Sequence, residues 1–242
     1  AEYHRMADGD DQKRLKFREL LRRMIDVCNT MQYAHSHRVI HRDLKPANIM
    51  VGEYGETLVV DWGLAKLLDE AEFEPAAKQR LRSKSRPVSD TDTMDGTALG
   101  TPQYMSPEQA SGKLSVVNSL SDIYSLGATL YHLLVGSPAF AGRDLSKLLH
   151  SVRTGEFAPP RELRSDVPPP LNSICLKAMA LKQEDRFATA QEMAAEIERW
   201  LADEPVHVHG EGLAERWYRR LRRHRSWVMG VATMVPLLLI VV

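Results

Sequence analysis

Apolar residues recur at helical spacing over two long parts of the chain. Residues 17–34 place them at intervals of three and four, which predicts an amphipathic helix with one buried face. Residues 121–136 are apolar nearly all round, which predicts a helix buried in the middle of the structure. Ser121 is the candidate cap at the start of this second helix, and Gly136 is the candidate end.

Three further helices are predicted in the second half of the chain. Residues 145–155 form a short amphipathic pattern, and residues 168–180 begin with prolines that place Pro170 in a first helical turn. Residues 189–204 open with Thr189 and Glu192, which have the spacing of a capping box. The chain is therefore expected to be mainly α-helical.

β structure is predicted only near the middle of the first half. The apolar runs at residues 48–51 and 57–62 are separated by "GEYGE", which is typical of a hairpin. Residues 69–96 are charged and rich in hydroxyl groups, so they predict a loop with no core of its own. The polar opening of the chain, residues 1–16, predicts a solvated loop or linker, and we assign residues 1–14 to a linker remnant.

Composition and charge fit a globular protein. The 242 residues are 43% hydrophobic and 26% charged, and the formal net charge is zero, so no nucleic-acid partner is expected. Cys28 and Cys175 both lie in helical apolar patterns, which predicts buried reduced thiols and no disulfide. His207 and His209 could be two metal ligands, but no third ligand is evident, so a surface linker is favoured.

The C-terminal part of the sequence predicts a membrane anchor. Residues 227–242 contain no charged residue, and these sixteen positions span about 24 Å as a helix, short of a hydrocarbon core of about 30 Å. We expect the start of a membrane-spanning helix, with residues 203–226 as a basic juxtamembrane linker; a buried core helix is the alternative. Positive charge next to a span favours the cytoplasmic side, which predicts a single-pass protein of the inner or plasma membrane. Six arginines supply that charge: Arg216, Arg219, Arg220, Arg222, Arg223 and Arg225.

Four polar residues around the predicted hairpin carry the chemistry. Asp43, Lys45 and Asn48 share one loop, and Asp61 ends the second strand, so a hairpin brings Asp61 back beside Asn48. Carboxylate and amide oxygens suit Mg²⁺ together with phosphate oxygens. The remaining carboxylate can accept a proton from a hydroxyl, and the lysine neutralises a transferred phosphoryl group. The spacing therefore predicts metal-assisted phosphoryl transfer to an alcohol.

These motifs resemble those of eukaryotic-like (Hanks-type) serine/threonine protein kinases. "HRDLKPAN" followed by "DWG" is similar to the catalytic loop and the metal-binding motif of that family. The resemblance implies that Asp43 is the catalytic base and that Asn48 and Asp61 hold Mg²⁺. It also implies that Lys45, Asn48 and Asp61 contact ATP, and Lys45 resembles the serine/threonine class.

Other motifs follow in the order of the family. "GTPQYMSPE", residues 100–108, resembles the segment that receives the substrate, and "SDIYSLG" resembles the helix whose Asp122 braces the catalytic loop. Arg186 resembles the arginine that pairs with Glu108. The resemblance covers residues 15–202, with an activation segment at residues 61–108.

Two positions depart from the family's pattern. Trp62 replaces phenylalanine, and it can fill an apolar slot against His41. Ser106 replaces alanine. Neither change removes a catalytic atom.

The family's upstream motifs cannot be identified in residues 1–40. No glycine-rich phosphate loop, "VAIK"-like lysine or partner glutamate helix is found there. We therefore expect the C-terminal lobe of a kinase with the N-terminal lobe absent, inactive by itself. Its parent is expected to be a membrane-anchored kinase that uses ATP and Mg²⁺ on protein serine and threonine. The alternative is a pseudokinase scaffold.

Regulation by phosphorylation is expected in the activation segment. Thr97 precedes Thr101 by four residues, the offset at which the family often carries an activating phosphothreonine, and Arg42 is the expected partner of that phosphate. Thr91 and Thr93 are competing sites. Thr101 is expected to contact Asp43 and Lys45 instead. Dimerisation for autophosphorylation is possible.

Overall fold

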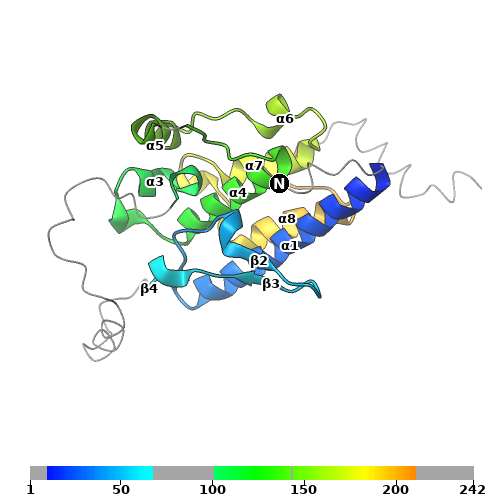
Figure 1. Cartoon of the computed structure of the whole chain (residues 1–242), viewed down its shortest axis with the longest axis horizontal. Coiled ribbons are helices and arrows are strands. Elements are labelled where there is room, and N and C mark those ends of the chain that lie inside the picture. The colour runs from blue at the N-terminus through cyan, green and yellow to red at the C-terminus, as the bar shows by residue number, and fades with distance from the viewer. Residues whose placement is uncertain (1–9, 68–100, 143, 211–242) are drawn as a thin grey trace, which may run out of the picture.

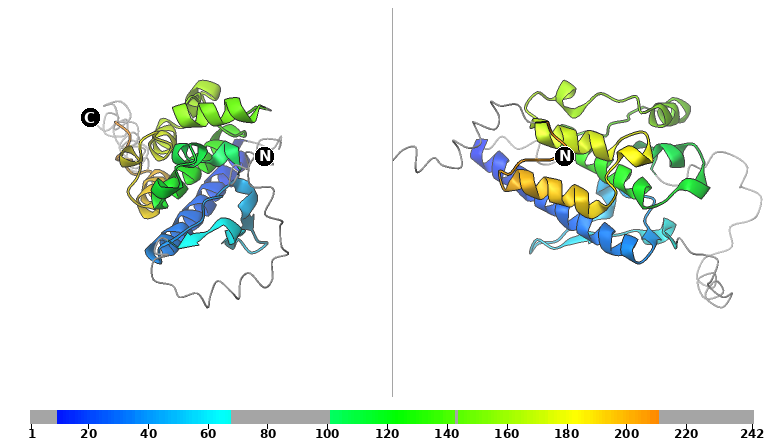
Figure 2. Two further views of the ribbon diagram at one scale, coloured as in Figure 1. Left: turned by 90° about the vertical axis from the view of Figure 1, so that its left-hand side faces the viewer. Right: turned by 180° about the vertical axis from the view of Figure 1, so that it is seen from behind.

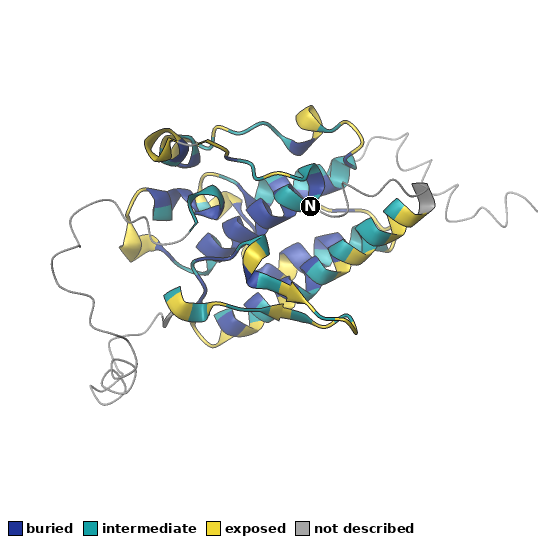
Figure 3. Cartoon of the chain, in the orientation of Figure 1, coloured by how far each residue is buried: buried dark blue, intermediate teal, exposed yellow. Residues whose placement is uncertain are grey.

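The computed structural model describes residues 10–67, 101–142 and 144–210, which form a mainly helical lobe with a small β-hairpin (Figure 1). Helix α4 (Ser119–Val135) runs through the middle, and its residues are buried along most of its length (Figure 3). α1 (Asp10–Ser36) packs along α8 (Ala190–Leu201), as the view from behind also shows (Figure 2). α7 (Pro169–Ala178) packs along α4.

α1 is longer than the apolar pattern predicts. The loop prediction for residues 10–16 is wrong, because the helix already begins at Asp10. Residues 12–16 are good helix formers, and α1 can extend past its buried face without further packing. The predicted apolar face is correct: Leu21, Met24, Cys28 and Met31 are all buried.

The start of α4 also differs from the prediction. Asn118 is the N-cap, and its side-chain oxygen accepts a hydrogen bond from Leu120 N at 2.8 Å. Ser121 returns the contact by accepting from Asn118 N at 3.3 Å, so it completes a capping box but does not start the helix. Gly136 ends α4 as predicted, in the left-handed conformation with φ of 90°.

The other predicted helices are present. α5 (Leu145–Thr154) and α7 follow their predicted ranges closely, and Pro170 lies in the first turn of α7. Thr189 caps α8 by accepting from Glu192 N at 3.1 Å, but the Glu192 carboxylate accepts from Ala188 N instead of Thr189 N. The shorter helical elements are α3 (Pro107–Ala110), α6 (Pro160–Leu163), η2 (Pro46–Asn48), η3 (Trp62–Leu64), η4 (Pro102–Tyr104), η5 (Leu114–Val116) and η6 (Gln183–Asp185).

Two antiparallel strand pairs flank the catalytic loop. β2 (Ile49–Val51) pairs with β3 (Thr57–Val59), with Met50 opposite Leu58, which confirms the predicted hairpin. A second pair was not predicted: β1 (Val39–Ile40) pairs with β4 (Lys66–Leu67). Strands of two residues are too short for an alternating pattern to appear in the sequence.

The two cysteines lie in the core as expected. Cys28 on α1 and Cys175 on α7 are buried and free of disulfides. Burial raises the pKa of the Cys28 thiol to about 12 and raises that of Cys175 as well. Both thiols are therefore protonated at neutral pH.

The segment after α8 folds back onto the lobe. Val206 is buried, and Glu196 on α8 accepts from His207 N at 2.6 Å. The His207 ring faces Glu196, whereas the His209 ring lies 3.1 Å from Ser173 Oγ, so the two imidazoles have different partners. Among the residues of the described lobe, no group of three His, Cys, Asp or Glu side chains could hold a metal ion.

Several predictions fall on residues outside the described ranges. These are the loop at residues 69–96, the basic residues 216–225 and the membrane segment at residues 227–242. Within residues 10–67, 101–142 and 144–210, no helix combines the length and apolar character needed to cross a bilayer.

Candidate active site

The catalytic loop is tied to the central helix by one buried carboxylate. Asp122 on α4 accepts from His41 N and Arg42 N, each at 2.9 Å, which confirms its predicted bracing role. The ring of His35, at the end of α1, lies 2.8 Å from Asp122 Oδ2. Asp122 therefore joins α1, α4 and the loop, and the contribution of His35 was not predicted.

Arg42 forms the turn that presents the next residue. Its φ of 67° is left-handed, which is uncommon for a residue with a long side chain. Gln109 Nε2 donates to Arg42 O at 2.7 Å, and Arg42 Nε donates to Leu64 O. These contacts hold the strained turn and fix the direction of Asp43.

Asp43, Lys45 and Thr101 form a closed triangle of hydrogen bonds. Lys45 Nζ donates to Asp43 Oδ2 at 2.7 Å and to Thr101 Oγ1 at 2.6 Å, while Thr101 N donates to Asp43 Oδ1 at 2.8 Å. Asp43 is only 9% exposed. This confirms the expected contacts of Thr101 and places the Lys45 ammonium group within hydrogen-bond distance of both the Asp43 carboxylate and the Thr101 hydroxyl.

Asn48 is oriented by the same loop. Its Nδ2 donates to Asp43 O at 2.8 Å, which leaves its side-chain carbonyl oxygen as the possible metal ligand. Val60 N donates to Asn48 O at 2.9 Å, so the backbone brings the neighbouring Asp61 back to Asn48 as predicted. Asp61 is exposed, and its backbone has the left-handed conformation, with φ of 63°.

The donor set of this pair fits Mg²⁺. One amide oxygen and one carboxylate are hard ligands, and Mg²⁺ is commonly bound by one or two protein groups together with phosphate oxygens. Asn48 and Asp61 are the residues that would hold it.

Trp62 occupies the slot expected for it. Its ring centroid lies 4.6 Å from that of His41, and its indole nitrogen donates to Val59 O at 2.9 Å. The larger indole therefore keeps the packing against His41, and its N–H group has a partner.

Glu108 and Arg186 form the predicted ion pair in a buried position. The two guanidinium nitrogens of Arg186 donate to the two Glu108 oxygens at 2.8 and 3.0 Å. Ser121 Oγ and Gln183 Nε2 also donate to Glu108, at 2.6 and 2.9 Å. Burial opposes ionisation, but Arg186, Ser121 and Gln183 together lower the Glu108 pKa to about 2.

Ser106 adds a contact that the family's usual alanine cannot make. Its hydroxyl donates to Gln109 Oε1 at 3.0 Å and accepts from Gln109 N at 3.4 Å, as part of a capping box at the start of α3. Gln109 is the residue that also donates to Arg42 O. The Ser106 hydroxyl thus helps to hold the Gln109 side chain that bonds the catalytic loop.

An exposed apolar surface beside the metal ligands was not predicted as part of the site. Met50 and Leu58 are a cross-strand pair, 56% and 57% exposed, so both point away from the lobe on one face of the hairpin. Asn48 precedes β2 and Asp61 follows β3, so this apolar face lies next to the two candidate metal ligands. β2 is apolar throughout and does not alternate, so the sequence carries no sign of which of its side chains are exposed.

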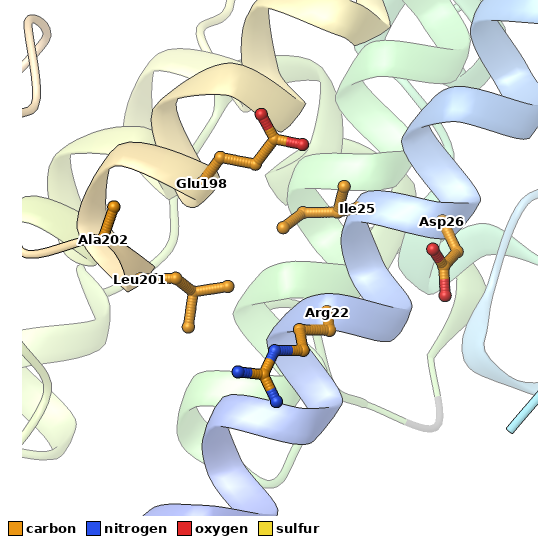
Figure 4. Close-up of a pocket in the computed structure, with 6 residues that line it drawn as sticks. All are labelled: Arg22, Ile25, Asp26, Glu198, Leu201 and Ala202. Carbon is orange, nitrogen blue, oxygen red and sulfur yellow. The ribbon is translucent and has the colours of Figure 1, made fainter.

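A hollow on the described lobe lies elsewhere. It measures about 460 Å³ between α1 and α8 and is lined by Ile25, Leu201, Ala202 and the charged residues Arg22, Asp26 and Glu198 (Figure 4). None of Asp43, Lys45, Asn48 or Asp61 lines it. The expected phosphorylation sites Thr91, Thr93 and Thr97 lie outside the described residues.

Comparison with known proteins supports this interpretation of the motifs. The family model described as a protein kinase domain matches residues 2–197. The serine/threonine-protein kinase PknB of Mycolicibacterium smegmatis is 35% identical over 174 residues, covering 72% of this chain and 25% of that protein. A probable serine/threonine-protein kinase of Corynebacterium efficiens is 38% identical over 181 residues, covering 72% of this chain and 24% of that protein.

A relative named for a different substrate class is about as similar. The tyrosine-protein kinase MasK of Myxococcus xanthus is 35% identical over 201 residues, covering 80% of this chain and 27% of that protein. The chain spans about a quarter of the length of these curated relatives.

Proposed function

We propose a function from one premise: the chain belongs to the eukaryotic-like protein kinase family. The protein that contains it transfers the γ-phosphate of ATP to serine and threonine hydroxyls of other proteins. The observation that carries this proposal is the Asp43–Lys45–Thr101 triangle, held to α4 through Asp122.

Each residue of the site has one role in the transfer. Asn48 and Asp61 hold Mg²⁺, which neutralises charge on the phosphates when ATP is bound. Asp43 orients the substrate hydroxyl and accepts its proton. Lys45, 2.7 Å from Asp43, stabilises the transferred phosphoryl group. The exposed Met50–Leu58 pair gives the adenine ring an apolar surface beside the metal ligands.

The choice of serine and threonine over tyrosine is supported by Lys45. Its ammonium group spans Asp43 and Thr101, so it occupies the space directly beside the base. A short aliphatic hydroxyl fits this crowded position. Phosphoamino-acid analysis of the substrates decides the class, and phosphotyrosine as the main product would contradict the proposal.

The Asp43→Asn variant of the full-length protein tests the activity. The substitution keeps the size of the side chain and removes the charge that accepts the proton, so turnover should fall by at least about a hundredfold, within the range of general-base catalysis. Asp166→Asn is the matched control, since Asp166 is exposed and pairs with Arg164 on the surface. If the Asp43→Asn variant keeps more than a tenth of wild-type turnover, Asp43 is not the catalytic base.

The 242-residue chain by itself is proposed to lack activity. The phosphate loop and the nucleotide-binding lysine of the family cannot be identified in residues 1–40, so ATP has only part of its binding surface. The second candidate is a pseudokinase scaffold, and the presence of Asp43, Lys45, Asn48 and Asp61 favours an enzyme over it. Calorimetry of the chain with Mg-ATP should show no low-micromolar binding.

We also propose that the lobe is tethered to the cytoplasmic face of a membrane. The support is the uncharged segment at residues 227–242 and the six arginines between residues 216 and 225. External protease should leave the lobe intact in whole cells, and cleavage there would reverse the orientation.

A further inference from the structure

The outer end of the β2–β3 hairpin is held against α1 by charged side chains. Arg23 Nη1 donates to Gly55 O in the hairpin turn. Asp26, one turn further along α1, accepts from Thr57 Oγ1 at 3.1 Å. Arg23 and Asp26 also face each other at 3.6 Å, so the two contacts form one continuous clamp.

The turn is shaped for this clamp. Gly55 has a φ of +90°, and a Cβ atom at this position would lie 2.7 Å from Arg23 Nη2. The backbone conformation thus requires glycine, and a side chain at this position would also displace the guanidinium from its contact. Gly52 N donates to Glu56 O at 2.8 Å and closes the turn, while Tyr54 at the tip is 93% exposed.

The hairpin needs such support because it is small. Each strand has three residues, and an isolated two-stranded hairpin is marginally stable at best. Asn48 directly precedes β2, and Asp61 follows β3 after one intervening residue. Because the two side chains leave different strands, a shear of one strand past the other changes their separation, and the contacts of the turn and of Thr57 to α1 oppose such a shear.

We propose that Arg23 and Asp26 are positioning residues for the metal-binding pair. They fix the outer end of the hairpin to α1 and so keep Asn48 and Asp61 at the spacing that Mg²⁺ requires. The metal-binding part of this proposal rests on the proposed kinase function, whereas the mechanical part rests on the contacts of Arg23 and Asp26 alone.

Arg22 provides a matched control on the same helix. It is exposed, lines the hollow between α1 and α8 and points away from the strands, whereas Asp26 is turned toward them (Figure 4). Arg22→Gln therefore removes the same charge as Arg23→Gln without touching the clamp. At the other end of the clamp, Thr57→Ser keeps the donating hydroxyl and Thr57→Val loses it.

Hydrogen exchange in the 242-residue chain tests the mechanical part. The Gly52 amide donates to Glu56 O within the hairpin, and the Val60 amide donates to Asn48 O at its inner end. They should exchange about tenfold faster in Arg23→Gln and in Thr57→Val, because each variant loses one contact to a charged group. Exchange should be unchanged in Arg22→Gln and in Thr57→Ser. Unchanged exchange in Arg23→Gln would overturn the clamp, whether or not the protein is a kinase.

The Mg²⁺ dependence of the full-length enzyme tests the positioning part. In Arg23→Gln the Mg²⁺ concentration for half-maximal activity should rise by about threefold to tenfold, with turnover at saturating Mg²⁺ within about twofold of wild type. A merely structural role would lower turnover and leave the Mg²⁺ dependence unchanged, and that result would refute the positioning role. If the wild-type protein transfers no phosphate, the kinase proposal fails and the exchange experiment alone decides the clamp.

Discussion

Two buried tyrosines on the central helix differ by one hydrogen bond. Tyr131 Oη donates to Ala158 O at 2.9 Å, whereas the hydroxyl of Tyr124 has no partner within the described part of the chain. Arg186 lies over the Tyr124 ring at 5.0 Å, a contact that phenylalanine preserves. Burial raises the pKa of both phenols, to about 12 for Tyr131, so both are neutral under physiological conditions.

The two tyrosine-to-phenylalanine variants should therefore have different effects. Tyr131→Phe leaves the Ala158 carbonyl without its donor and should lower the free energy of unfolding by about 1 kcal/mol. Tyr124→Phe removes an unsatisfied hydroxyl and should leave that free energy unchanged or raise it by up to about 1 kcal/mol. Urea unfolding of both variants measures the difference. Equal losses would show that the Tyr124 hydroxyl is bonded in solution.

The sequence predicted the site residues that belong to recognisable motifs. Asp43, Lys45 and Asn48 are close in the chain, and their spacing alone indicates their chemistry. His35 and Gln109 were missed because each acts through a partner far along the sequence, Asp122 for the first and the Arg42 carbonyl for the second. A single polar side chain on a helix gives no sign of such a long-range partner.

The contact between α3, α4 and η6 depends on an ionised carboxylate. Glu108 has a pKa of about 2 in the folded lobe, below its ordinary value of 4.5, mainly because Arg186 offsets the cost of burial. A lowered folded-state pKa contributes stability above pH 4.5, and this contribution is lost as the pH falls toward 2. One pKa unit corresponds to about 1.4 kcal/mol, so the shift of the Glu108 pKa from 4.5 to about 2 contributes about 3 kcal/mol to the free energy of unfolding.

The variant Glu108→Gln should remove this part of the acid sensitivity. Its unfolding free energy should be lower than that of wild type at pH 7, because Arg186 keeps its buried charge without a counterion. The difference between the two proteins should shrink between pH 4.5 and pH 2, as Glu108 becomes protonated in the wild type. Denaturant unfolding at a series of pH values measures the difference in unfolding free energy. A constant difference between pH 4.5 and pH 2 would contradict the lowered pKa of Glu108.

The ends of the elements were the least predictable part of the fold. Apolar spacing places the middle of α1 and α4 correctly, because buried faces repeat at the helical period. It does not show that α1 extends back to Asp10 or that Asn118 caps α4, since polar residues at helix ends satisfy backbone groups without entering the core. The β1–β4 pair depends on two residues in each strand and has no pattern of its own.

At the scale of the whole lobe, the buried helix explains the architecture. Residues 121–136 are apolar nearly all round, so we expect them to be surrounded by other elements. α7 packs along α4, while Asp122 at the start of α4 reaches the catalytic loop and the end of α1. The same helix thus forms the core and aligns the site.

Control of the whole enzyme is expected to act through Arg42. This residue bonds Leu64 O in the segment after Asp61, and its carbonyl accepts from Gln109, which directly follows the substrate-receiving segment. Both ends of the activation segment thus meet at the residue next to Asp43. A phosphate in the segment carries about −1.5 to −2 charges at neutral pH, and a guanidinium can hold it by two charge-assisted bonds. We propose that phosphorylated Thr97 binds Arg42 in this way. The enzyme would transfer the phosphoryl group to Thr97 itself, within one copy of the protein or from one copy to another.

The variant Thr97→Ala of the full-length protein tests this control. It should lower activity about tenfold or more if pairing with Arg42 contributes the roughly 1.5–3 kcal/mol typical of a charged hydrogen bond. Mass spectrometry of the active enzyme should find phosphate on Thr97, and Thr91→Ala and Thr93→Ala are the matched controls at the competing sites. Because the pairing needs both groups, Arg42→Gln should cost much less in the Thr97→Ala background than in the wild type. Full activity of Thr97→Ala, with position 97 unmodified in the wild type, would assign the control to another site.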